Sequence, residues 1–102
     1  MKYTIDKSVF ELNPDIKFGI LIGNDMKNSA TSQDDEERLR KAESKMRDEI
    51  KPEDIRNLHN VSLYRDVMQK SGINPNKYPP SVEAMFKRIV KGGQLPVINA
   101  LV

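Results

Sequence analysis

The sequence predicts a mixed α/β (α+β) domain in which about three helices pack on a small mixed β-sheet. The most apolar run, Ile16–Ile22, is short and rich in β-branched residues, which is typical of a buried strand. Later segments instead repeat apolar residues every three or four positions, as amphipathic helices do. The chain has 102 residues, so we expect a single domain over residues 1–102.

Composition narrows the class of protein. The absence of cysteine excludes disulfides, thiolate metal ligands and cysteine nucleophiles, and it fits a reducing cytosol. The first twelve residues carry too many charges for a signal peptide. No apolar run approaches the roughly 20 residues that span a bilayer. We therefore expect a cytoplasmic protein with no membrane partner.

The N-terminal region contains the first predicted strands. Tyr3–Ile5 alternates in polarity and predicts a short strand. A turn at Asn13–Asp15 then leads into the strand Ile16–Ile22. Gly19 within that strand indicates a bulge or the close approach of another backbone.

A charged helix is predicted next. Thr31 or Ser32 can cap its N-terminus, and the acids Asp34–Glu37 suit the positive end of the helix dipole. Acidic residues precede basic ones by four positions on its surface, for example Glu43 before Arg47. The apolar stripe consists of Leu39, Ala42, Met46 and Ile50.

Pro52 ends this helix and can open a further turn, with Ile55 and Leu58 as core candidates. A second helix is predicted over Val61–Ser71. Its expected buried residues are Leu63, Tyr64, Val67 and Met68. Gly72 suits the left-handed position after a helix, and Ile73 can fold back onto it.

The third helix has the clearest pattern. Ser81 is its predicted N-cap, and Gly92–Gly93 is its stop. Its apolar residues recur at helical spacing, and we expect them to pack on the strand Ile16–Ile22: Val82, Met85, Phe86, Ile89 and Val90.

The final residues form an apolar segment. Leu95–Ile98 predicts a strand or extended chain, and Asn99 could cap a helix that begins at Ala100. An apolar edge left open would invite pairing with another chain. We therefore expect Val97, Ile98 and Leu101 to be buried by this chain, by a second copy or by a missing C-terminal half.

No motif predicts a metal, a cofactor or a catalytic centre. Adjacent acids such as Asp34–Glu37 diverge on a helix, whereas metal ligands converge. His59 has no partner at a recognisable spacing, so a surface or turn role is expected. The glycines form no phosphate-binding loop.

Basic residues outnumber acidic ones in the C-terminal half of the chain. Residues 1–54 hold ten Lys and Arg against thirteen Asp and Glu, whereas residues 55–102 hold seven against two. RNA phosphates bind Lys and Arg, and RNA bases stack on tyrosine, so this half could contact tRNA. The alternative is that these basic residues are scattered over the surface without a common partner. The candidate residues are Arg65, Lys77, Tyr78, Lys87, Arg88 and Lys91, with Tyr64 expected in the core.

The stretches VFELNPDIKFGILIG, LYRDVMQKSGINPNKYPPSVEAMFKRIVKGG and LPVINALV resemble the B3/B4 domain of the phenylalanyl-tRNA synthetase β subunit and its free-standing relatives. The resemblance covers nearly all of residues 8–102 and implies a layered α/β fold. In the synthetase this domain is the editing module, which hydrolyses tyrosine wrongly attached to tRNA. Asn99 matches an asparagine near that editing pocket.

The chain resembles only the N-terminal half of the family domain, because relatives continue past the INALV-like segment. Pro79 also stands where relatives often carry a basic residue. The resemblance implies aminoacyl-tRNA hydrolysis only for a longer form.

The first hypothesis for the function is therefore a tRNA-related domain. The alternative is a non-catalytic binding or assembly module, or an inactive truncated fragment, and we expect a homo-oligomer or a missing half. Asn74, Asn76, Glu83 and Arg88 match positions of the free-standing relatives; we expect the two asparagines to form turns and Glu83 to pair with Arg88.

Overall fold

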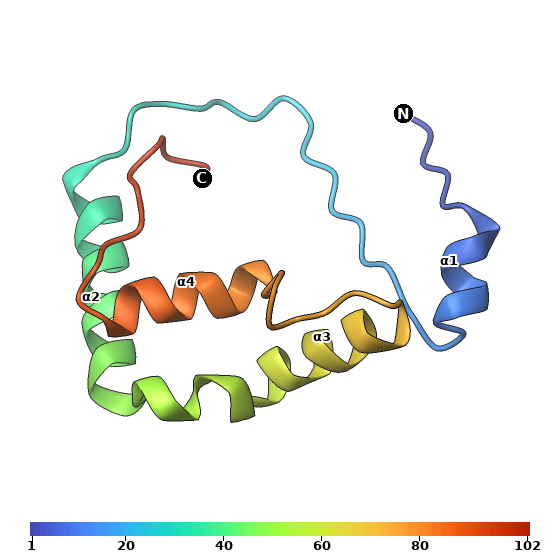
Figure 1. Cartoon of the computed structure of the whole chain (residues 1–102). Coiled ribbons are helices and arrows are strands. Elements are labelled where there is room, and N and C mark those ends of the chain that lie inside the picture. Colours follow the sequence, from blue (N-terminus) through green and yellow to red (C-terminus); the bar gives the residue numbers. More distant parts are fainter.

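The structure is a computed structural model that describes all 102 residues, and its regular secondary structure is entirely helical (Figure 1). No residue belongs to a β-strand, so the α/β prediction is wrong. The elements, in chain order, are α1 Lys7–Leu12, α2 Gln33–Glu49, the 3-10 helix η1 Pro52–Asn57, α3 His59–Lys70 and α4 Ser81–Val90.

The predicted strands fail because none of them has a partner. Tyr3–Ile5, Ile16–Ile22 and Leu95–Ile98 all lie outside regular structure, and none forms a backbone ladder. A strand exists only through hydrogen bonds to a neighbour, so period-two apolarity alone does not make a sheet. Gly19 consequently has no ladder in which to form a bulge. The short helix α1 was not expected.

The start of α2 follows the predicted capping chemistry. The Ser32 hydroxyl accepts a bond of 3.1 Å from the Asp35 N–H, and the Asp35 carboxylate accepts one of 3.2 Å from the Ser32 N–H. This reciprocal capping box satisfies two donors that the helix leaves unpaired. Along the helix, Ala42 is exposed and Glu43 takes its place on the inner face. The half-buried apolar residues there are Leu39, Met46 and Ile50.

Two glycines end helices as predicted. Gly72 has a φ of 79° and Gly92 a φ of 93°, in the left-handed region that suits glycine. After α3, the N–H of Ile73 donates to the Met68 carbonyl at 2.9 Å. After α4, the N–H of Gly93 donates to the Arg88 carbonyl at 2.8 Å. Both ends are Schellman motifs, which satisfy carbonyls left open by the last turn. At the start of α4, however, the N-cap is Pro80, and Ser81 makes no capping bond.

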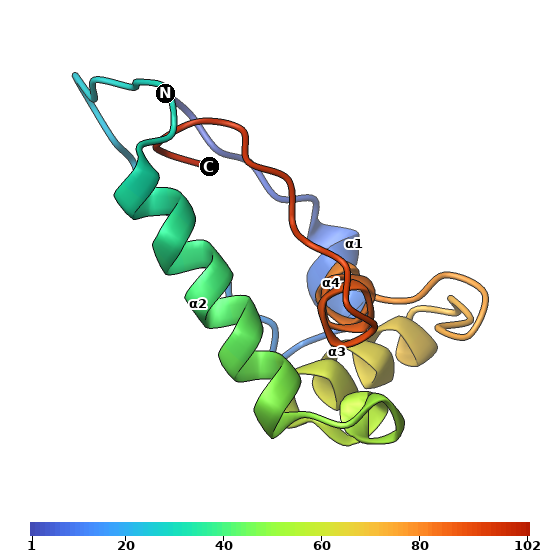
Figure 2. The ribbon, with the colours of Figure 1, turned by 90° about the vertical axis from the view of Figure 1, so that its left-hand side faces the viewer.

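Helices α2, η1, α3 and α4 form one unit, which we call the helical frame. In Figure 1, α4 runs alongside the η1–α3 edge and ends beside α2; in Figure 2, where α4 is seen end-on, α2 runs diagonally past one side of it. Helix α4 contacts α2 and η1, so its packing against Ile16–Ile22 was wrongly predicted. The buried apolar side chains of the frame are Ile55, Val61 and Ile89.

The outer faces of the frame carry more apolar surface than expected. Leu63, Tyr64 and Val67 are exposed, which contradicts their assignment to the core. Helix α3 contacts η1, and no helix covers its other side. Met85 of α4 is exposed for the same reason, whereas Val82, Phe86 and Val90 are half-buried.

The molecule is open and flat, measuring 45 × 42 × 19 Å. Its radius of gyration is 16.9 Å, against about 13 Å for a compact chain of this length. Only seven of 102 residues are buried. The expected burial of Val97, Ile98 and Leu101 is not supplied by the rest of the chain, since all three are exposed.

Candidate functional site

The best-defined polar centre of the frame surrounds Glu83, in the first turn of α4. Its side chain is fully buried. The Arg65 guanidinium of α3 donates to its carboxylate at 2.7 Å, and the Lys87 ammonium, one turn further along α4, lies 3.1 Å away. Arg56 of η1 stands at 3.9 Å. One carboxylate thus joins three helical elements, and the predicted partner, Arg88, is not among its neighbours.

Arg65 also fixes the loop between α3 and α4. Its guanidinium donates to the Pro75 carbonyl at 3.3 Å and to the side-chain oxygen of Asn76. The predicted turn at Asn74 is confirmed, because its side-chain oxygen accepts from the Asn76 N–H at 3.0 Å. Since its donors point into this network, Arg65 has a structural role in the single chain.

Two opposing effects act on the pKa of Glu83. Burial raises the pKa by disfavouring the charged form, but the hydrogen bonds from Arg65 and Lys87 and the charges of both lower it by more. The net pKa lies below the usual 4.5. Glu83 is therefore an ionised anchor at neutral pH, which is the opposite of what a general acid requires.

A second buried glutamate holds the chain that leaves α4. Glu43 of α2 pairs with Arg40 at 2.5 Å, and it accepts a bond of 3.1 Å from the Leu95 N–H. Arg40 in turn donates to the Leu95 carbonyl at 3.1 Å. The two side chains hold both backbone polar groups of one residue, Leu95, so the segment after α4 is fixed against α2.

These glutamates were not predicted as site residues, although their spacing carried the signal. Glu43 follows Leu39 by four positions and precedes Met46 by three, so it lies on the apolar stripe of α2. Glu83 likewise precedes Phe86 by three positions on α4. A charged residue in register with a buried stripe indicates a buried ion pair.

The other basic candidates do not converge on one patch. Lys77 lies 5.3 Å above the ring of Tyr78, which is exposed in the loop before α4. Arg88 and Lys91 are exposed at the opposite end of that helix. Ten helical residues span about 15 Å, so the two groups are separated by the length of α4. Among the seven predicted residues, Arg65 and Lys87 are brought together from different helices, whereas Lys77 and Tyr78 are adjacent in the sequence.

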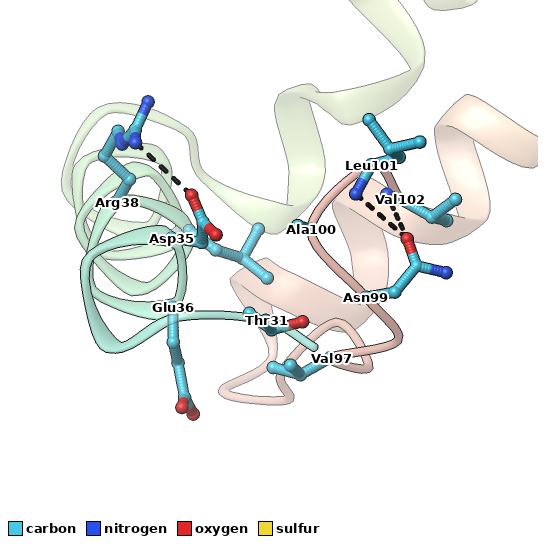
Figure 3. Close-up of a pocket in the computed structure, with 10 residues that line it drawn as sticks. Thr31, Asp35, Glu36, Arg38, Val97, Asn99, Ala100, Leu101 and Val102 are labelled. Carbon is cyan, nitrogen blue, oxygen red and sulfur yellow. Dashed lines mark hydrogen bonds and ion pairs between the residues drawn. The ribbon is translucent and has the colours of Figure 1, made fainter. Parts of the chain in front are cut away.

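Asn99 lies apart from all of these, beside the N-terminus of α2 (Figure 3). It borders a shallow pocket of about 240 Å³. Its side-chain oxygen accepts from the N–H groups of Leu101 and Val102 at 2.9 and 3.0 Å. These bonds close a turn, and the helix expected from Ala100 does not form. On the opposite wall of the pocket, the Asp35 carboxylate accepts a hydrogen bond from the Ser32 N–H and pairs with the Arg38 guanidinium at 3.3 Å.

The most unusual surface is the connection between α1 and α2, which we call the exposed segment, residues 14–28. Figure 1 shows it as a drawn-out trace without helical turns. Leu21 is 99% exposed and Ile20 53%. None of the backbone N–H and C=O groups of residues 17–28 pairs with another backbone group. The most apolar run of the chain, predicted to be buried, thus faces solvent with its backbone bonding groups unused.

This segment is tied down at both ends. Before it, the Asn13 amide donates to the Ser71 hydroxyl at 3.2 Å, at the end of α3. Phe18 meets Phe10 of α1 edge to face, with ring centroids 5.9 Å apart. After it, the Ser29 carbonyl accepts from the Ala100 N–H at 3.0 Å. The frame therefore presents the segment between two fixed points.

Neither the structure nor the comparisons assign a known chemistry. No group of three or more metal-ligating side chains is close enough together to hold an ion, and no helix has the length and apolarity to cross a membrane. No protein-family model, curated protein or solved structure matches the chain.

Proposed function

We propose that the chain is a non-catalytic binding module that offers the exposed segment to a protein partner as a β-strand. The observation that carries this proposal is the row of unpaired backbone groups over residues 17–28. An extended peptide with free N–H and C=O groups binds by adding a strand to a partner, and alternate side chains supply specificity.

The side chains of the segment support the same mode of binding. Phe18, Ile20 and Ile22 are about half exposed, and they share one face if the segment is a strand. An exposed apolar row of this kind marks a surface that another molecule covers. The buried glutamates support a non-catalytic role, since Glu43 is occupied by Arg40 of the same helix and Glu83 by Arg65 of α3.

Photocrosslinking tests this proposal. Leu21 is replaced by photoreactive p-benzoylphenylalanine, and the matched control carries the same group at Lys41, an exposed position on α2. We expect a single saturable protein adduct from position 21 in the source cells, and none from position 41. A synthetic peptide of residues 14–28 should suppress the adduct, and a scrambled peptide should not. Equal labelling from both positions, or no competition by the peptide, would contradict the proposal.

A second candidate function is contact with tRNA. The observation that favours it is the exposed Lys77–Tyr78 pair, in which a cation lies over an aromatic ring that is 57% exposed. Phosphate contact by lysine and base stacking on tyrosine are both used by RNA-binding proteins. The exposed Arg88 and Lys91 add positive charge at the other end of α4.

Salt dependence and paired variants test the RNA candidate. Binding of tRNA should weaken steeply as salt rises, because each phosphate contact releases counterions. Tyr78→Ala should remove stacking, worth about 1–3 kcal/mol per base. Lys77→Glu should also weaken binding, and Lys41→Glu on α2 is the control for its change of charge. Absence of tRNA binding at low salt with micromolar protein would exclude this candidate.

A further inference from the structure

We infer that the partner of the exposed segment is a second copy of the same segment, paired antiparallel about a two-fold axis at Leu21. This inference rests on the proposed binding function, and it names the partner. It follows from the order of charges along residues 15–27 and from the exposure of the backbone between them.

The segment carries four charged residues around an apolar centre: Asp15, Lys17, Asp25 and Lys27. In an antiparallel pair with Leu21 opposite Leu21, residues equally far from position 21 face each other. Asp15 then faces Lys27 of the second copy, and Lys17 faces Asp25. Two-fold symmetry repeats both pairs, so every charge of the segment meets an opposite charge. Opposite charges directly across two strands stabilise the pairing.

Neighbouring registers lack this match. Centring the pair on Ile20 would place Asp15 against Asp25 of the second copy. Centring it on Ile22 would place Lys17 against Lys27. A parallel pair in register would oppose each charge to itself. Like charges directly opposite each other are destabilising, so the charge pattern selects the register at Leu21.

The apolar residues fit the same register. Residues with even numbers share one face of a strand, and here Ile20 meets Ile22 while Ile16 meets Met26. On the other face, Leu21 meets its own copy between the charged pairs. Gly19 faces Gly23, so no side chains crowd the backbones beside that leucine. This pairing covers Leu21, the most exposed of the large apolar side chains at 99%.

One local change accompanies the pairing. Asp25 has a φ of 53°, in the left-handed region that non-glycine residues seldom occupy. Asp25 becomes extended when it enters the strand, and the extended conformation is common for such a residue.

The expected dimer is weak, because a two-stranded ribbon alone is only marginally stable. The dimer should therefore be reversible and dependent on concentration in the micromolar range.

Charge-swap variants of the full chain test the pairing by sedimentation. Lys17→Asp alone places two acids opposite each other, twice per dimer, and Asp25→Lys alone does the same with two bases. Each should raise the dimer dissociation constant about tenfold or more. An equimolar mixture of the two variants restores opposite charges, and native mass spectrometry should detect the heterodimer. The double variant should recover the homodimer.

Matched controls carry the same charge changes on α2, at Lys41→Asp and Asp48→Lys, where both side chains are exposed. These should dimerise as the unmodified chain does, and helical circular dichroism should confirm that all variants fold. A chain that stays monomeric over the micromolar range would overturn the inference, as would a dimer insensitive to the single swaps or single variants that fail to complement each other. If Leu21 still crosslinks to a different protein, self-pairing fails while the binding function stands.

Discussion

The helical frame and the exposed segment differ in what holds their residues in place. The frame is rich in charge, yet two buried glutamates and the local helix hydrogen bonds fix it. The exposed segment is the most apolar run in the chain, yet nothing covers it. Apolar content alone therefore does not decide burial. A segment becomes part of a core when its backbone also finds partners, as it does within every helix.

The substitution with the largest expected effect is Glu83→Ala. It leaves the Arg65 guanidinium, 13% exposed, without its carboxylate in the centre of the frame. Loss of one member of a buried ion pair costs about 3–5 kcal/mol, so we expect a large fall in the melting temperature. The matched control is Glu53→Ala in η1, an exposed acid, which should change stability by less than about 0.5 kcal/mol. Equal melting of both variants would show that Glu83 is not an anchor.

A second pair of substitutions compares one apolar residue from the frame with one from the exposed segment. Ile55 is 1% exposed and Leu21 is 99% exposed. Ile55→Ala removes buried methyl groups and should cost about 2–4 kcal/mol. Leu21→Ala in dilute solution should cost less than about 0.5 kcal/mol, because the side chain contacts only water. Chemical denaturation of both variants gives the two values. A comparable loss from Leu21→Ala at low concentration would mean that the segment is packed within one chain.

The sequence predicted correctly those features of the frame that depend on neighbouring residues, and it failed for the exposed segment. Ser32, Gly72 and Gly92 were correctly placed because caps and helix stops depend on neighbouring residues alone. Ile16–Ile22 was wrongly predicted as a buried strand, because both the strand and its burial require a partner that no pattern within the segment specifies.

For the candidate site, the sequence identified Arg65 and Lys87 but assigned them to RNA. Glu83 was expected to pair with Arg88, and its burial between these two residues was missed because acids are usually exposed. Only the three-dimensional contact between α3 and α4 shows that both cations pair with a buried carboxylate of the same chain.

The third prediction concerns the cap of α2. Ser32→Ala removes the hydroxyl that accepts from the Asp35 N–H and should destabilise the frame by about 1 kcal/mol. Ser29→Ala, three positions earlier in the connection, should have less effect because its hydroxyl bonds only to the adjacent Ala30 carbonyl. Thermal melts measure the difference. An equal effect of the two substitutions would place α2 outside the stabilised frame.

The smallest expected effect is a difference in acid sensitivity. Because the pKa of Glu83 is lowered in the folded chain, ionisation favours folding above the unfolded value near 4.5. That contribution is lost as the pH falls through the folded pKa. Glu83→Gln lacks the titrating group, so its melting temperature should fall less between pH 6 and pH 3 than that of the unmodified chain. Parallel pH dependences would contradict an ionised Glu83.

Amide hydrogen exchange, measured residue by residue on the monomer at low concentration, tests most directly whether the exposed segment lacks partners within one chain. We expect slow exchange at Ile89 and its neighbours in α4, where backbone bonds are packed within the frame. We expect fast exchange across residues 17–28, where no backbone group pairs with another. Protection of Ile20–Ile22 at a level similar to α4 in the monomer would show internal strand pairing and contradict the account.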